Sequence, residues 1–105
     1  DEVAHATVKS LLRVVPAAVP GVAFLSGGQC PKLASARLNA MNARFKSRVP
    51  WSLVFSFSRA IQQPVLEIWK GDAVNVTAAQ QALYHRASYN SAACRGEYET
   101  SMESK

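Results

Sequence analysis

The stretch GVAFLSGGQ, residues 21–29, joins a short apolar run to an open turn made of one serine and two glycines. An apolar run of this length, bounded by Pro20 and by the glycines, is typical of a strand that is buried on both faces, as in a parallel sheet. The two glycines leave backbone N–H groups uncovered by side chains. The turn therefore either lets the strand bend or receives an anion such as a phosphate.

A second apolar run, WSLVFSF at residues 51–57, is rich in aromatic and β-branched residues and predicts a second strand. Apolar residues at helical spacing predict four helices, over residues 2–15, 31–42, about 60–69 and about 76–93. The order of these elements indicates an α/β protein with a parallel sheet. Because two strands do not form a stable sheet alone, the pattern predicts a section of a larger α/β fold.

Glycine, proline and short polar residues mark the expected ends of the two later helices. Gly71 and Gly96 are predicted to terminate the third and fourth helices. Asn75 or Thr77 is predicted to cap the fourth helix at its amino end. Pro64 falls inside the third helix, where a proline costs about 3 kcal/mol unless the helix kinks or starts there.

The length and composition favour one globular domain or a piece of one, and the net charge weakly favours anionic partners. The chain has 105 residues, of which 49% are hydrophobic, and 12 basic against 7 acidic residues give a formal net charge of +5. The only basic cluster comprises Arg44, Lys46 and Arg48, in a predicted loop over residues 43–49. We interpret this cluster as a solvated loop, and no nucleic acid is expected as a partner.

The cysteines and histidines do not predict a metal site. Cys30 and Cys94 are far apart in the sequence and lack metal-ligand spacing, so reduced thiols in the cytoplasm are expected. Cys30 stands at a predicted helix start, which would lower the pKa of its thiol. His5 and His85 are expected to be surface or partly packed groups. No run of 18 apolar residues and no signal or transit peptide is present, so no membrane partner is expected.

Both predicted strands are followed by residues that can donate hydrogen bonds to an anion, and these residues define the candidate site. Ser26, Gly27 and Gly28 follow the first strand, and Ser56 and Arg59 stand at the end of the second. Ligands of α/β folds bind beyond the carboxyl ends of the strands, where helix N-termini and a guanidinium attract anions. A Gly-Gly pair is usually only a turn and an arginine there is often only a surface group. The two features together leave a phosphate site and a plain turn as equal alternatives.

From about Val3 to Tyr98, the chain resembles the carboxyl-terminal portion of class I fructose-bisphosphate aldolases. Several short motifs occur in the right order, and together they make the resemblance specific. The matching stretches are VPAAVPGVAFLSGGQ (15–29), ASARLNAMN (34–42), PWSLVFSFSRAIQQ (50–63), a spaced W-K-G (69–71) and NSAACRGEY (90–98).

This resemblance implies the carboxyl-terminal section of a (β/α)8 TIM barrel, with its last two strands and their helices and hence an incomplete barrel. Residues 1–98 would form this section, and residues 99–105 are predicted to be a loose polar tail. The family cleaves fructose 1,6-bisphosphate into dihydroxyacetone phosphate and glyceraldehyde 3-phosphate, through a lysine Schiff base and without a metal or cofactor. Its members are usually homotetramers in the cytoplasm, with the plastid as the alternative compartment.

The resemblance also assigns roles to the candidate residues. Ser26, Gly27 and Gly28 match the turn that binds the 1-phosphate of the sugar-phosphate substrate, and Ser56 and Arg59 match further substrate-binding positions. The Schiff-base lysine of the family lies on a strand upstream of this chain. None of the five lysines here falls on a predicted strand, so no catalytic residue is expected within the chain and the isolated chain is predicted to be inactive.

A second interpretation is a truncated, diverged paralogue that lacks catalysis and acts as a binding or interaction module. Three departures from the family pattern favour it. Pro64 interrupts a helix that the family keeps regular, Lys70 replaces the first glycine of a Trp-Gly-Gly, and the family's tail continues to a terminal tyrosine whereas this sequence stops at Lys105. Ser58, where the family often has glycine or alanine, is a further difference.

Overall fold

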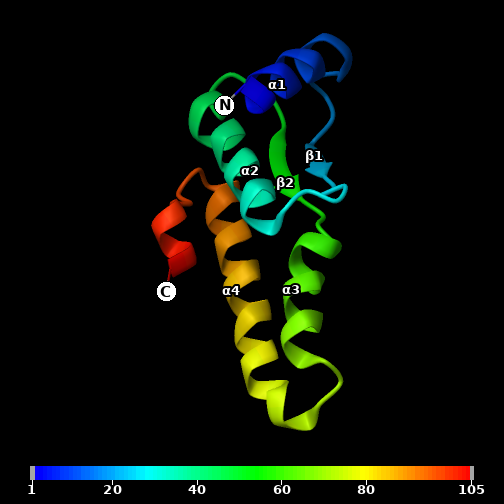
Figure 1. Cartoon of the computed structure of the whole chain (residues 1–105). Helices are drawn as coiled ribbons and strands as arrows, with labels where there is room; N and C mark the ends of the chain where they lie inside the picture. Colours follow the sequence, from blue (N-terminus) through cyan, green and yellow to red (C-terminus); the bar gives the residue numbers. More distant parts are fainter. Residues whose placement is uncertain (1, 105) are drawn as a thin grey trace.

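The computed structural model describes residues 2–104 and consists mainly of helices, with a small two-stranded sheet that lies beside α2 (Figure 1). The elements are α1 (Glu2–Val14), β1 (Gly21–Phe24), α2 (Pro31–Phe45), β2 (Ser52–Phe55), α3 (Arg59–Trp69), η1 (Ala73–Asn75), α4 (Val76–Cys94) and η2 (Thr100–Ser104). The two strands are parallel, which confirms the predicted α/β class.

The register of the sheet places the carboxyl ends of the two strands side by side. Gly21 pairs with Ser52 at one end, and Phe24 pairs with Phe55 at the other. The N–H of Ser56 donates to the carbonyl of Phe24 at 2.7 Å and extends the pairing beyond β2. The turns that follow β1 and β2 therefore leave from the same edge of the sheet, where α/β proteins bind ligands.

Helix α2 connects the two strands and lies at the centre of the hydrophobic core. It packs against α1, α4 and β2. The core consists of Ala4, Val8, Leu38, Met41, Phe45, Trp51, Leu53, Ala92, Ala93 and Tyr98. Helix α2 continues to Phe45, three residues beyond the predicted end at Asn42, because the Phe45 side chain is buried in this core.

Asn42 is a buried polar residue that ties α2 to its neighbours. Its Nδ2 lies 3.2 Å from the carbonyl of Leu38, 3.1 Å from that of Leu53 in β2 and 3.1 Å from that of Ala93 in α4. A buried amide stabilises a structure only where its hydrogen bonds are made, so this side chain fixes how the three elements fit together.

Helices α3 and α4 form an antiparallel hairpin that extends away from the sheet (Figure 1). Lys70 ends α3 in a left-handed conformation, and Gly71 follows with φ 72°. Asp72 accepts a hydrogen bond from the N–H of Val74 and caps η1. The Asn75 side chain donates to the carbonyl of Trp69, so it closes α3 and does not cap α4 as predicted.

Helix α3 runs through Pro64 and is not ended by it. The ring removes the N–H that would donate to the carbonyl of Ala60 and crowds that carbonyl, which lies in the first turn of the helix. The regular helix on both sides of Pro64 shows that this residue is compatible with the fold.

The segment after Tyr98 differs from the loose tail that we predicted. Residues Thr100–Ser104 form η2, which lies against α2 and α4. The carbonyl of Met102 accepts a hydrogen bond from the Tyr89 hydroxyl at 2.8 Å, and Glu103 forms an ion pair with α4. Specific polar contacts therefore hold residues 100–104 on the helices, and Lys105 lies outside the described residues.

Candidate functional site

The first part of the site is the turn that follows β1. The N–H and the side-chain amide of Gln29 both donate to the carbonyl of Ser26, at 3.0 and 2.9 Å, and close the turn. Gly27 and Gly28 lie between them with φ 58° and 86°, values that glycine adopts without strain. Arg37 donates to the Gln29 side chain at 2.7 Å and fixes it. The turn is thus held from one side, and the N–H groups of its glycines have no acceptor among residues 2–104.

The second part of the site is the amino end of α3, directly after β2. The carbonyl of Ser58 accepts hydrogen bonds from the N–H groups of Ile61 and Gln62, at 3.2 and 2.9 Å. The first N–H groups of a helix have no acceptor inside the helix and carry partial positive charge. The start of α3 therefore offers donors to an anion, and Arg59 adds a full positive charge at the same position.

The two turns meet at Gly28 and Arg59. A Cβ added to Gly28 would lie 3.7 Å from Nη2 and 3.9 Å from Nη1 of Arg59. In the part of the chain that the structure describes, Arg59 has no carboxylate partner. Ser26 is buried under the first turn, whereas Ser56 is exposed at the same strand edge. The predicted residues thus gather at one edge of the sheet, and we call them the anion cradle.

The anion cradle contains hydrogen-bond donors and positive charge but no nucleophile. The lysines at 9, 32, 46 and 70 are all exposed and lie on helices or helix ends, and Lys105 is outside the described residues. A lysine that forms a Schiff base needs a desolvated setting that lowers its pKa. The geometry therefore offers hydrogen-bond donors and positive charge at this edge of the sheet, and among residues 2–104 it places no lysine to attack a carbonyl.

Cys30 follows the first turn and precedes α2. The pKa of its thiol is lowered, as predicted, because the N–H groups of Leu33 and Lys32 at the start of α2 stabilise the thiolate. Burial raises the pKa of the Cys94 thiol, so the two cysteines differ in reactivity. Both cysteines are free thiols.

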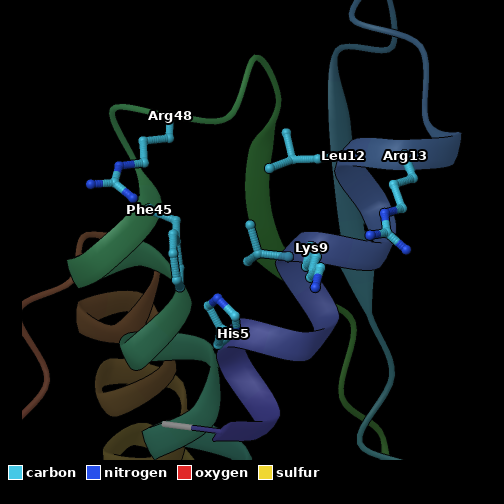
Figure 2. Close-up of a pocket in the computed structure, with 7 residues that line it drawn as sticks. His5, Lys9, Leu12, Arg13, Phe45 and Arg48 are labelled. Atoms are coloured by element: carbon cyan, nitrogen blue, oxygen red, sulfur yellow. The ribbon is translucent and has the colours of Figure 1, made fainter.

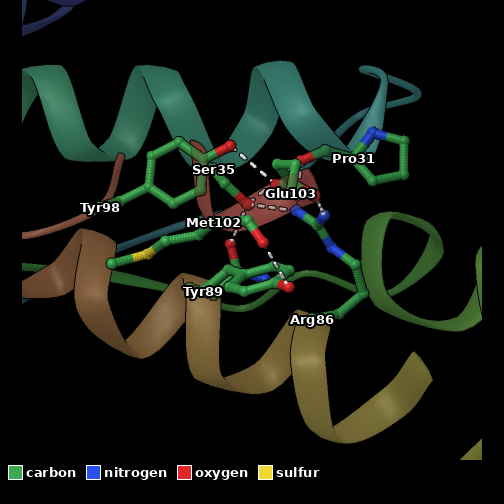
Figure 3. Close-up of polar contacts among 8 residues, drawn as sticks. Pro31, Ser35, Arg86, Tyr89, Tyr98, Met102 and Glu103 are labelled. Atoms are coloured by element: carbon green, nitrogen blue, oxygen red, sulfur yellow. Dashed lines mark hydrogen bonds and ion pairs between the residues drawn. The ribbon is translucent and has the colours of Figure 1, made fainter. Parts of the chain in front are cut away.

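A buried polar network, which was not predicted from the sequence, supports the first turn of α2 (Figure 3). Arg86 of α4 donates to the carbonyl of Pro31 at 2.9 Å and to the Ser35 hydroxyl at 2.5 Å. Its Nη1 lies 2.6 Å from Oε1 of Glu103 in η2, and both side chains are more than nine-tenths buried. Ser35 donates in turn to Asn90 at 2.7 Å. The guanidinium of Arg86 thus joins α4, η2 and the start of α2. Its partner in α2, Pro31, lies two residues after Gln29, which closes the first turn of the site.

Tyr98 completes this network from the other side of Glu103. Its hydroxyl donates to Oε2 of Glu103 at 2.7 Å. Burial, together with the adjacent carboxylate, raises the pKa of Tyr98 well above its usual value. The partners of Arg86 are separated from it by 17 to 55 positions in the sequence, so no local pattern could have shown this arrangement.

The described residues contain neither a metal-binding cluster nor a helix suited to span a membrane. Between residues 2 and 104, no three His, Cys, Asp or Glu side chains lie close enough together to hold a metal ion. No helix in this range combines the length and the apolar character needed to cross a bilayer.

Comparison with known proteins places the chain in a family. The whole chain, residues 1–105, matches the family described as Fructose-bisphosphate aldolase class-I. It is 55% identical over 101 residues to fructose-bisphosphate aldolase B of Gallus gallus, covering 96% of this chain and 28% of that protein. It is 54% identical over 98 residues to the cytoplasmic isozyme 2 of Pisum sativum, covering 93% and 27%.

A solved structure shows the same fold. The fructose-bisphosphate aldolase of Plasmodium falciparum, in a ternary complex with TRAP and a small molecule inhibitor, superposes with a TM-score of 0.86 at 47% identity, covering 92% of this chain and 27% of that one. The chain thus spans about a quarter of the length of the relatives that it matches. By the match over its full length, the chain belongs to the class I fructose-bisphosphate aldolase family.

Proposed function

We propose that this chain is the carboxyl-terminal section of a class I aldolase barrel and supplies its last two strands. The parallel β1–α2–β2 unit and the helices that follow support this assignment, because a right-handed strand–helix–strand unit is the repeating element of a (β/α)8 barrel. In such a barrel the turns after the last strands commonly form a phosphate site at the carboxyl edge.

The observation that carries the proposal is the meeting of Gly28 and Arg59 at that edge. We assign the phosphate of a sugar-phosphate substrate to the anion cradle. The N–H groups of Gly27 and Gly28 would donate to its oxygens, and the helix start at Ser58 and the guanidinium of Arg59 would balance its charge. The bare glycines allow the backbone to approach the phosphate closely.

The reaction that we propose is the cleavage of fructose 1,6-bisphosphate into dihydroxyacetone phosphate and glyceraldehyde 3-phosphate. Class I chemistry proceeds through a Schiff base on a lysine, and we place that lysine in the part of the family's length that this chain does not cover. The role of this chain is to orient the substrate by its phosphate, so that the carbonyl meets the lysine in one geometry. The isolated chain is expected to bind the phosphate without cleaving the sugar.

Assembly and compartment follow the same proposal. We expect the complete protein to be a cytoplasmic homotetramer, in line with the family and with the cytoplasmic isozyme of Pisum sativum. The alternative of a diverged binding module has less support, because α3 continues on both sides of Pro64 and the chain is 55% identical to fructose-bisphosphate aldolase B of Gallus gallus.

The binding test is a titration of the protein with dihydroxyacetone phosphate, followed by NMR. The Arg59→Ala variant is expected to bind at least tenfold more weakly, because a charge-assisted hydrogen bond contributes about 1.5–3 kcal/mol. Arg95→Ala is the matched control, since Arg95 is also an exposed arginine but lies near the end of α4. Equal affinities of the two variants would contradict the assignment of the cradle.

The chemical test uses the complete gene product that contains this chain. Borohydride reduction in the presence of dihydroxyacetone phosphate should leave one covalent adduct on a lysine outside these 105 residues. An adduct on Lys9, Lys32, Lys46, Lys70 or Lys105 would contradict our placement of the nucleophile, and no adduct at all would contradict the proposed reaction.

A further inference from the structure

A second collection of positive charge surrounds a cavity of about 420 Å³ between α1 and the carboxyl end of α2 (Figure 2). Its basic lining consists of His5, Lys9, Arg13 and Arg48, and the remaining lining residues are all apolar. A volume of this size is in the range of small-molecule sites. The cavity has no carboxylate in its lining, which is what an anionic ligand requires.

The charges on α1 lie on one face of the helix. His5, Lys9 and Arg13 are spaced by four residues, and Figure 2 shows them projecting from successive turns. Like charges at this spacing destabilise a helix by a few tenths of a kcal/mol per pair. Within residues 2–104 the ion pairs are Arg86–Glu103 and Arg95–Glu97, so no protein carboxylate neutralises Lys9 or Arg13.

The floor of the cavity is apolar and partly aromatic. It is formed by Val8, Leu12 and Phe45. The Phe45 ring centroid lies 6.0 Å from that of His5, with the two planes tilted by 43°. Leu12 is half exposed in the same cavity, so apolar surface there remains in contact with water.

The basic rim and the apolar floor together restrict which anions fit the cavity. A plain sugar phosphate has no apolar part to cover Leu12, and a fatty acid has one charge for a rim that carries at least three. A flat ring bearing two or more phosphates complements both features, because the ring can pack on the exposed part of Leu12, next to the buried Phe45, while charge-assisted hydrogen bonds hold the phosphates.

The cavity is separate from the anion cradle. Helix α2 crosses from the end of β1 to the start of β2, so its carboxyl end lies at the amino edge of the sheet. The cradle lies at the opposite, carboxyl edge. A ligand in this cavity would therefore not occupy the substrate phosphate site proposed above.

We infer that the cavity between α1 and α2 is a nucleotide-binding site for a nucleoside di- or triphosphate. The ring lies against Leu12 and Phe45, and the phosphates lie along Lys9 and Arg13, while Arg48 adds positive charge from the opposite wall. The inference does not depend on the proposed aldolase activity, because it uses different residues at the other edge of the sheet.

The test is calorimetric titration of the protein with ATP, tripolyphosphate and adenosine. ATP is expected to bind saturably and at least tenfold more tightly than either of its parts, since only ATP uses both the floor and the rim. The double variant Lys9→Gln/Arg13→Gln should weaken ATP binding at least tenfold, and Leu12→Ser about fivefold. Lys46→Gln is the control, because Lys46 is exposed on the same segment as Arg48 but does not line the cavity.

Four results would overturn the inference. The absence of saturable ATP binding would exclude the site, and an equal effect of Lys46→Gln would reduce it to general charge attraction. Displacement of ATP by fructose 1,6-bisphosphate would place the nucleotide in the cradle. Displacement of ATP by a glutamate-rich peptide at equal charge concentration would identify the cavity as a surface for acidic protein segments.

Discussion

Arg59 and Arg86 show how the same side chain serves two opposite purposes in one small structure. Arg59 is exposed, lies beside the bare backbone of Gly28 and has no carboxylate partner among residues 2–104. Arg86 is 6% exposed, and its terminal nitrogens reach a carboxylate, a hydroxyl and a carbonyl. Protein groups accept hydrogen bonds from the two terminal nitrogens of Arg86, whereas those of Arg59 stay available. Arg86 therefore maintains the fold, and Arg59 is suited to a ligand.

The strongest test of this difference between Arg86 and Arg59 is to remove each guanidinium in turn. Arg86→Ala is expected to lower the free energy of unfolding by about 3–5 kcal/mol, because it leaves the buried Glu103 carboxylate without its partner. Arg59→Ala should change stability by less than about 0.5 kcal/mol, as for other exposed positions. Urea denaturation measures both. Glu103→Gln serves as a milder variant if Arg86→Ala does not fold, and equal effects at 59 and 86 would refute the distinction.

Gly96 and Gly27 show the same contrast between a residue that maintains the fold and one that is open to a ligand. Their substitutions are expected to give the next largest changes in stability. Gly96 has φ 72°, and a Cβ there would lie 3.1 Å from both the Cα and the N of Ala43. Gly96→Ala is expected to destabilise the protein by about 2–4 kcal/mol, since left-handed strain and a clash with backbone of α2 add together. A Cβ on Gly27 would meet nothing within 4 Å, so Gly27→Ala should cost only the strain, about 1–2 kcal/mol.

The measurement for these glycines combines thermal unfolding with phosphate binding. Gly27→Ala should weaken binding of dihydroxyacetone phosphate more than it lowers stability, because the added methyl group would stand in open space next to an N–H group that we assign to the phosphate. Gly96→Ala should leave the affinity of the folded fraction unchanged. The opposite pattern would mean that the SGG turn serves only the fold.

Tyr98 tests the buried network through its pH dependence. Its pKa is raised in the folded state, so the tyrosine contributes full stability below the ordinary tyrosine pKa of about 10 and loses this contribution as the pH rises further. Removing its hydrogen bond to Glu103 in Tyr98→Phe should cost about 1.5–2 kcal/mol at pH 8. Urea midpoints at pH 8 and pH 10.5 should fall more steeply in the parent protein than in the variant, and parallel slopes would contradict the role of Tyr98.

Much of the fold could be predicted from local patterns, because each element is encoded by residues close together in the sequence. The run at residues 21–25 predicted β1, and helical spacing predicted α1 and α4 within about a residue of their ends. The anion cradle was predicted from the parallel topology. The carboxyl ends of the two strands lie at one edge of the sheet, which brings Gly28 and Arg59 together. Its assignment to a substrate phosphate remains a prediction.

What could not be predicted depends on contacts between distant residues. The extension of α2 to Phe45 follows from burial of that ring against other elements, not from the polar sequence around it. The order in η2 depends on Arg86, which lies in the middle of α4 and showed no feature that set it apart from a surface arginine. A polar tail looks loose in the sequence because the residue that binds Glu103 is 17 positions away.

Substitution of Lys70 is expected to give the smallest change in stability. Lys70 ends α3 and has no proposed contact with a ligand, so it tests backbone strain alone. It has φ 54° at the carboxyl end of α3, a left-handed conformation that costs a residue with a Cβ about 1–2 kcal/mol. Glycine would remove this strain, but its greater conformational freedom in the unfolded chain lowers the free energy of unfolding by about 0.4–1 kcal/mol. Lys70→Gly should therefore stabilise the protein by about 0.5 kcal/mol, with no change in phosphate affinity, and Lys70→Ala, which keeps the strain, should not. A loss of stability in Lys70→Gly would mean that the lysine side chain itself stabilises the turn between α3 and α4.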